Sequence, residues 1–117
     1  MTDNIYNYGY RVPRFPADFP LFLQIDDCHP TPVNARCTDL SEAGLAAEIK
    51  QSLEIGAKVT LILTLPGTSI SMRIAANVIH RQGNGYGFAF VFSSQSQQSA
   101  LHEYLESRYR PTVRSSE

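Results

Sequence analysis

The strongest constraint on the fold of this chain is an alternation of side chains on both sides of a Pro66-Gly67 pair. Apolar residues occupy positions 59, 61, 63 and 65 before the pair, and positions 70, 72, 74, 76 and 78 after it. A period of two residues is typical of a β-strand with one buried face, and a Pro-Gly pair is a strong turn signal. The segment therefore predicts a β-hairpin with one apolar face on each strand.

Shorter segments with strand-like patterns flank this hairpin, and a helix is expected near the C-terminus. The expected strands are residues 19–26, 33–38, 45–49 and 87–92, joined by turns rich in Gly, Pro, Asn and Asp. After residue 93 the period becomes helical, with Ser94 or Ser96 as the candidate cap and Leu101, Tyr104, Leu105 and Arg108 at helical spacing. Short antiparallel strands followed by one helix favour a mostly β fold, a small antiparallel barrel with the helix as its lid.

Composition limits the classes of function. A chain of 117 residues with 43% hydrophobic side chains is long enough for one folded core and too short for two. A net charge of -1 argues against a nucleic acid polymer as partner, because such binders normally carry a basic surplus. No run approaches the roughly 18 apolar residues of a membrane helix, and the first residues lack the layout of a signal peptide. We expect a cytoplasmic protein without membrane insertion.

The two ends of the chain differ from the middle. Residues 1–10 are polar and aromatic without periodicity, which predicts a flexible N-terminal arm. A single domain is expected over residues 11–108, with a frayed tail over 109–117. At the start of the domain, Pro13, Pro16 and Pro20 exclude a helix and favour an extended segment that displays Arg11 and Arg14.

Three motifs stand in a fixed order along the domain. They are Arg11-Val-Pro-Arg14-Phe-Pro before the first strand, Asp39-Leu-Ser41-Glu-Ala-Gly44 between the second and third, and Gly87-Phe-Ala-Phe90 near the end. Together with the strand pattern from about Tyr10 to about Leu105, they resemble the PilZ domain family. The resemblance implies a six-stranded antiparallel, or split, β-barrel with a C-terminal α-helix. It also implies binding of the bacterial second messenger cyclic di-GMP as ligand, with no cofactor.

The chemistry of the motif residues fits such a ligand, and the resemblance makes Arg11, Arg14, Asp39, Ser41 and Gly44 the candidate ligand-binding residues. A guanidinium fork matches phosphate oxygens or the O6/N7 edge of guanine. The Asp39 carboxylate can accept hydrogen bonds from guanine, the Ser41 hydroxyl can donate or accept, and Gly44 can take a positive φ and bring backbone close. Tyr10 stands where the family has its first arginine and is a candidate for stacking on a guanine.

The resemblance leaves two functions to compare. A receptor would relay the signal to a protein partner when the arm orders on the ligand. The alternative is a PilZ-like protein-interaction module of pilus, motility or polysaccharide regulation that does not bind cyclic di-GMP, which the Tyr10 position favours. By itself, Asp-x-Ser-x-x-Gly is also ordinary turn chemistry.

Enzyme and metal functions have little support in the sequence. No nucleophile stands with a base in a known motif, so no catalysis is expected. The spacing of Cys28, His29, Cys37 and His80 matches no zinc pattern, and His80 is expected near a strand end. Cys28 and Cys37 are expected to be free thiols rather than a disulfide.

Overall fold

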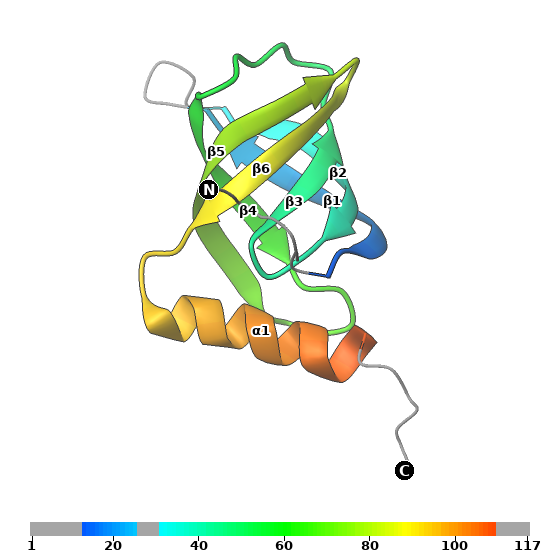
Figure 1. The fold of residues 1–117 in the computed structure, drawn as a ribbon, viewed down its shortest axis with the longest axis vertical. Coiled ribbons are helices and arrows are strands. Elements are labelled where there is room, and N and C mark those ends of the chain that lie inside the picture. The colour runs from blue at the N-terminus through cyan, green and yellow to red at the C-terminus, as the bar shows by residue number, and fades with distance from the viewer. Residues whose placement is uncertain (1–12, 26–30, 110–117) are drawn as a thin grey trace, which may run out of the picture.

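The computed structural model describes residues 13–25 and 31–109, and this part of the chain forms six strands and one helix (Figure 1). The strands are β1 (Phe15–Gln24), β2 (Val33–Leu40), β3 (Gly44–Glu48), β4 (Lys58–Thr64), β5 (Ser71–Gln82) and β6 (Gly85–Val91). The helix α1 (Gln95–Tyr109) follows them. The prediction of a mostly β domain with a C-terminal helix is confirmed.

The strands close into a barrel in the order β1-β2-β3-β6-β5-β4, and every neighbouring pair is antiparallel. Closure comes from β4, which pairs with β5 on one side and with the end of β1 on the other, where Phe22 lies opposite Ile62. In the middle of the order β3 pairs with β6, and Leu45 lies opposite Phe88. A closed barrel leaves few unpaired strand edges, so most of the backbone of the alternating segments is paired with a neighbouring strand.

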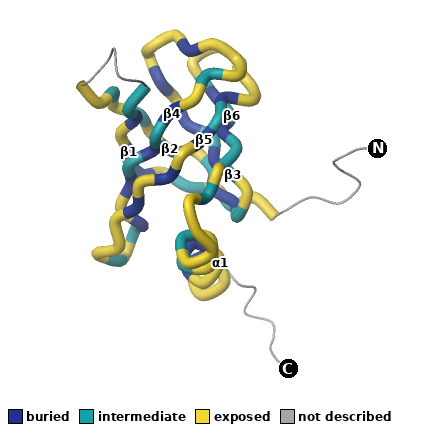
Figure 2. The backbone as a smooth tube through the Cα atoms, turned by 90° about the vertical axis from the view of Figure 1, so that its left-hand side faces the viewer, coloured by how far each residue is buried: buried dark blue, intermediate teal, exposed yellow. Residues whose placement is uncertain are grey.

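The core fills the inside of this barrel. Alternate residues of each strand are buried, including Leu23, Leu61 and Ile74, which have no exposed surface (Figure 2). The helix lies across one end of the barrel and contributes Leu101, Tyr104 and Leu105 to the same core (Figure 1). Because side chains occupy the interior, a ligand must bind on the outer surface.

The expected hairpin turn and the expected helix cap both form. The β4–β5 hairpin turns at Pro66-Gly67, where Gly67 has a φ of 81° that favours glycine. The Tyr104 hydroxyl donates a hydrogen bond to the Pro66 carbonyl at 2.8 Å and ties α1 to this hairpin. At the start of α1 the cap is Ser94, whose hydroxyl accepts the Gln97 N–H at 3.1 Å, whereas Ser96 lies inside the helix.

The expected start of the first strand is wrong by four residues, since β1 begins at Phe15 rather than at residue 19. Pro16 and Pro20 lie within β1, opposite Asp39 and Arg36 of β2. Only Phe22 to Gln24 of β1 also pair with β4. The proline-containing half is therefore a strand edge on its other side, where a missing N–H is tolerated.

Some sequence predictions concern residues outside the described ranges. They are the arm at 1–10, the tail beyond 109, Arg11, Tyr10, Cys28 and His29. No helix in the described ranges has the length and apolar character required to cross a membrane.

Candidate ligand-binding site

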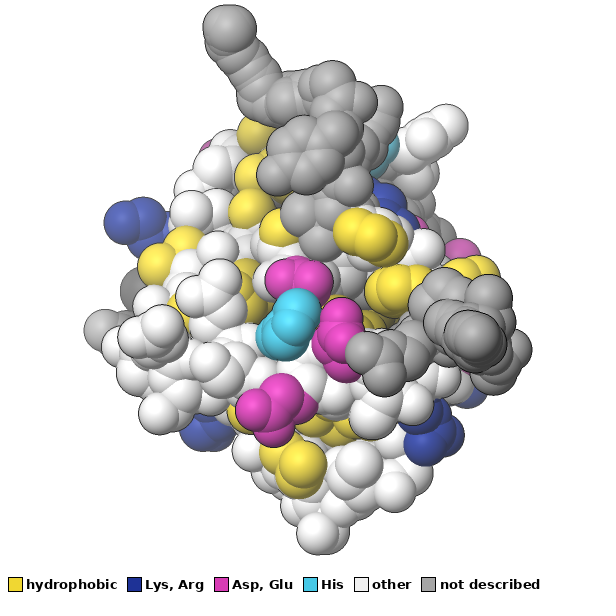
Figure 3. Space-filling model, turned by 60° about the horizontal axis from the view of Figure 1, so that its bottom comes forward, with side chains coloured by type: hydrophobic (Ala, Val, Ile, Leu, Met, Phe, Trp, Pro, Cys, Tyr) yellow, Lys and Arg dark blue, Asp and Glu magenta, His cyan; other side chains and the backbone are white. Residues whose placement is uncertain are grey.

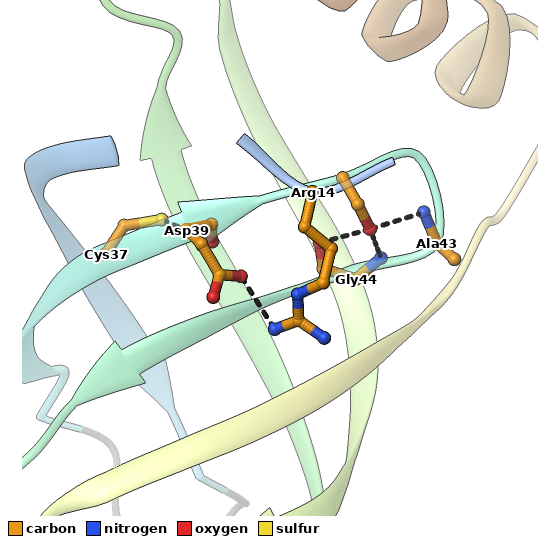
Figure 4. A network of polar contacts seen from close by, with 6 residues as sticks. Arg14, Cys37, Asp39, Ala43 and Gly44 are labelled. Atoms are coloured by element: carbon orange, nitrogen blue, oxygen red, sulfur yellow. Dashed lines mark hydrogen bonds and ion pairs between the residues drawn. The ribbon is translucent and has the colours of Figure 1, made fainter. Parts of the chain in front are cut away.

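The turn between β2 and β3 is built around the Ser41 hydroxyl. Its oxygen accepts the N–H groups of Ala43 and Gly44, both at 3.1 Å, and its proton is positioned for the Gly44 carbonyl at 3.1 Å (Figure 4). The Ser41 N–H donates to the same carbonyl at 2.9 Å. A hydroxyl has one proton and two lone pairs, and all three are used within the turn. Ser41 is buried, so it holds the turn in shape in this conformation.

A glycine is required at position 44, where the turn ends and β3 begins, because β6 lies very close. A Cβ built on Gly44 would stand 2.0 Å from the carbonyl oxygen of Phe88, which belongs to the β6 backbone and cannot rotate away. The Phe90 N–H also donates to the Ala43 carbonyl at 2.8 Å, so the turn is fixed against β6. The expectation of a positive φ at Gly44 is wrong: the positive φ values fall on other glycines. Close approach of a neighbouring strand is the physical reason for this glycine.

A β-bulge directs Asp39 to the outside of the barrel. Cys37 lies opposite Ala47 and Asp39 lies opposite Ala46, so β2 carries one extra residue at this point. Strict alternation from the buried Cys37 would place Asp39 in the core. The extra residue instead leaves Leu40 buried and Asp39 partly exposed, which is a common effect of bulges near binding sites.

Arg14 meets this carboxylate from the segment that leads into β1. Its Nη2 donates to Asp39 Oδ1 at 2.7 Å (Figure 4). The side chains are 57% and 29% exposed. An ion pair at such exposure stabilises the fold by only about 0–1 kcal/mol. Both groups can therefore turn to an incoming ligand at little cost.

The thiol of Cys37, two residues before Asp39, is buried and stays protonated at neutral pH. Cys37 has no exposed surface, and its sulfur lies 3.2 Å from the Asp39 carbonyl oxygen. Burial, with a smaller contribution from the Asp39 charge, raises the pKa of Cys37 from its ordinary value of 9.0 to about 12. It is a free thiol in the structure, as expected.

Arg14, Asp39, Ser41 and Gly44 all line one cleft of about 490 Å³ on the outer surface. Its floor has no side chain larger than a methyl group, because the outward positions of β3 and β6 that line it are Gly44, Ala46, Gly85, Gly87 and Ala89. Its other side is formed by Ile79, His80 and Gln82 of β5. The volume lies within the roughly 300–1,000 Å³ typical of small-molecule sites.

The same turn also contacts the helix. Glu42 Oε2 of the turn lies 3.1 Å from His102 Nδ1 of α1, and His102 Nε2 lies 4.0 Å from Glu106 Oε2 one helical turn later. The helix end of the molecule shows a histidine among acidic side chains (Figure 3). The turn that carries Ser41 is thus joined to β6 on one side and to α1 on the other.

Sequence reasoning missed the β5 wall and the floor of the cleft. His80 lies near the end of β5, as expected, but its place on the wall of the cleft was not expected. The alternation of Gly85, Gly87 and Ala89 was a usable signal for a flat floor. In the described ranges, no three His, Cys, Asp or Glu side chains are placed to hold a metal ion.

A model of the PilZ domain family matches residues 11–107. The chain belongs to the PilZ domain family. PilZ domains are binding domains and are generally not catalysts. No curated protein matches the chain.

Solved PilZ structures share the fold at low sequence identity. The PilZ domain of CeSA from a cellulose-synthesizing bacterium superposes with a TM-score of 0.65 at 18% identity, covering 84% of this chain and 99% of that one. The PilZ domain of YcgR from Escherichia coli, solved with c-di-GMP, gives 0.67 at 21%, covering 88% and 93%. The Bacillus subtilis inhibitor of motility, MotI/DgrA, gives 0.61 at 17%, covering 92% and 54%.

Proposed function

We propose that this PilZ domain is a receptor for cyclic di-GMP. The observation that carries the proposal is the convergence of Arg14, Asp39 and the Ser41–Gly44 turn on one cleft of about 490 Å³. The YcgR domain with the same fold was solved with c-di-GMP, which supports this class of ligand. Tyr10 and Arg11 come shortly before the described part of the domain, which begins at residue 13, and we assign them to the same site.

The exposed pair gives the cleft the donors and acceptors that a guanine nucleotide needs. The Arg14 guanidinium can pair with a phosphate or with guanine O6 and N7, and the Asp39 carboxylate can accept from guanine N–H groups. Ser41 and Gly44 act through the backbone, because they fix the turn that carries Asp39 against β6. The Gly and Ala floor leaves room for a flat purine.

Binding would be passed to a protein partner through the surface around the cleft. A ligand that engages Asp39 and Arg14 would order the preceding arm against the barrel and change the surface that a partner meets. The Glu42–His102 contact gives α1 a direct link to the same turn. Nothing in this scheme requires catalysis.

Isothermal titration of cyclic di-GMP into the purified protein tests the proposal, with GTP as a nucleotide that should not compete. We expect saturable binding that is weakened at least about tenfold by Arg14→Ala, because a charge-assisted bidentate contact contributes about 1.5–3 kcal/mol. Arg36→Ala is the matched control, since Arg36 also pairs with an aspartate, Asp18, on an exposed surface outside the cleft. Equal weakening by both substitutions would argue for a general charge effect.

A second candidate function is favoured by the residue at position 10. The family has its first arginine where this chain has Tyr10, and Arg11 stands one position later. In that case the domain would be a protein-interaction module that does not bind the nucleotide. Absence of binding heat for the wild type at high protein concentration would select this function.

A further inference from the structure

A second β-bulge faces the same cleft from the opposite wall. In the β5–β6 pair, Val78 lies opposite Phe88 and His80 lies opposite Gly87, so β5 has one extra residue at Ile79. Val78 is buried, and strict alternation would bury His80 as well. The bulge leaves both Ile79 and His80 exposed, side by side in the chain, and both line the cleft.

The neighbouring strand β6 lies close to these two side chains and has no side chain of its own at the point of contact. Gly87 of β6 has no Cβ, and one placed there would stand 3.3 Å from the His80 Cβ and 3.8 Å from the Ile79 Cγ1. Ile79 is 58% exposed, which is high for a large apolar side chain. The His80 side chain has no hydrogen bond or ion pair with any described residue, so nothing described holds the imidazole away from a ligand. Ile79 and His80 together form an apolar and aromatic shelf beside a glycine.

The position of this shelf suits a ligand with two bases. Since β3 and β6 lie between β2 and β5, Asp39 and the shelf are three strand spacings apart, about 14 Å along the sheet. Arg14 and Asp39 stand at one side of the cleft, where they can contact one guanine and its phosphate. A cyclic dinucleotide has a second guanine to place, and every base offers a flat face for stacking.

We propose that the Ile79–His80 shelf binds the second guanine of cyclic di-GMP, with the imidazole of His80 stacked on the base. This inference rests on the proposed function and adds a contact surface on β5 to it. The shelf is a product of the bulge, since without the extra residue Ile79 and His80 would point to opposite faces of β5.

The test is titration of cyclic di-GMP into paired variants whose folding is checked by thermal unfolding. We expect His80→Ala to weaken binding at least about fivefold, because base–aromatic stacking is worth about that much or more. His80→Phe should stay within about threefold of the wild type, since phenylalanine keeps the stacking face. Ile79→Ala should weaken binding by about threefold. Ile55→Ala is its matched control, because Ile55 is 60% exposed and does not line the cleft.

The outcomes distinguish failure of the proposed shelf from failure of the proposed receptor function. Wild-type binding that is lost in Arg14→Ala but unchanged in His80→Ala would overturn the shelf and leave the proposed function standing. Binding by His80→Phe as weak as that of His80→Ala would also overturn it, because the stacking face is kept in phenylalanine. Absence of binding by the wild type would overturn both proposals.

Discussion

A glycine can be needed in a turn for its backbone conformation or for lack of space, and at Gly44 the second reason applies. Sequence chemistry suggested a backbone conformation that other residues avoid, whereas the structure shows a strand so close that a side chain has no space. Ser41 has a similar history: it was expected to contact the ligand, and its hydroxyl is fully engaged in the turn. In both cases the structure gives the residue a role in shaping the turn, and that role depends on contacts that the sequence motif alone does not show.

The contact at Gly44 predicts the effect of the smallest substitution. Gly44→Ala places a methyl group 2.0 Å from the Phe88 carbonyl oxygen, so β3 and β6 must move apart. We expect a loss of at least about 2 kcal/mol in the free energy of unfolding, measured by chemical denaturation. Gly85→Ala is the control, because its Cβ would approach the Gln82 carbonyl oxygen only to 3.3 Å. Equal losses in the two variants would show that the close approach to β6 is not the cause.

The strands and the helix are the part of the fold that the sequence predicts well. Period-two alternation and Pro-Gly or Gly-Asn turns are local signals, and each expected segment forms a strand near its expected place. The bulges at Ile79 and before Asp39 are not local signals, because an extra residue exists only relative to the partner strand. The sequence therefore identified the residues of the β2 wall by motif and missed the wall that the β5 bulge creates.

The helix gives a prediction about how the barrel is closed. Leu101 has no exposed surface and packs into the barrel core from α1. Leu101→Ala should lower the free energy of unfolding by about 2–5 kcal/mol, because it removes buried methyl groups and leaves a cavity. Gln98→Ala, on an exposed position of the same helix, should change it by less than about 0.5 kcal/mol. Equilibrium urea unfolding of the two variants measures the difference. A loss below about 1 kcal/mol for Leu101→Ala would mean that α1 contributes little to the core.

The molecule as a whole places a packed core directly beneath the candidate binding cleft. Cys37 points into the core on one side of the bulge, and Asp39 points outward on the other side. The cleft and the core therefore share one segment of β2. A barrel whose interior is filled can bind only at its surface, and the glycine and alanine residues of the β3–β6 floor leave the space there. Stability and binding are thus linked through the backbone of β2 rather than through a shared cavity.

The pH dependence of stability tests the burial of Cys37 in the intact protein. Burial raises the pKa of this thiol from 9.0 to about 12, so above pH 9 the unfolded chain loses a proton that the folded chain keeps. The unfolded state then binds fewer protons, and the free energy of unfolding falls as pH rises. Below about pH 8 the thiol is protonated in both states and has no effect on the pH dependence, whereas at about pH 10 the free energy of unfolding should be lower by about 1.4 kcal/mol.

Cys37→Ala removes the titrating group and lowers stability at every pH through its small cavity, so the two proteins are compared by the slopes of their free energy of unfolding against pH. We expect denaturant unfolding at about pH 8 and about pH 10 to show a steeper loss for the wild type than for Cys37→Ala. Parallel pH profiles would mean that the thiol ionises as readily in the folded protein as in the unfolded one, and that the segment beneath Asp39 is open to water.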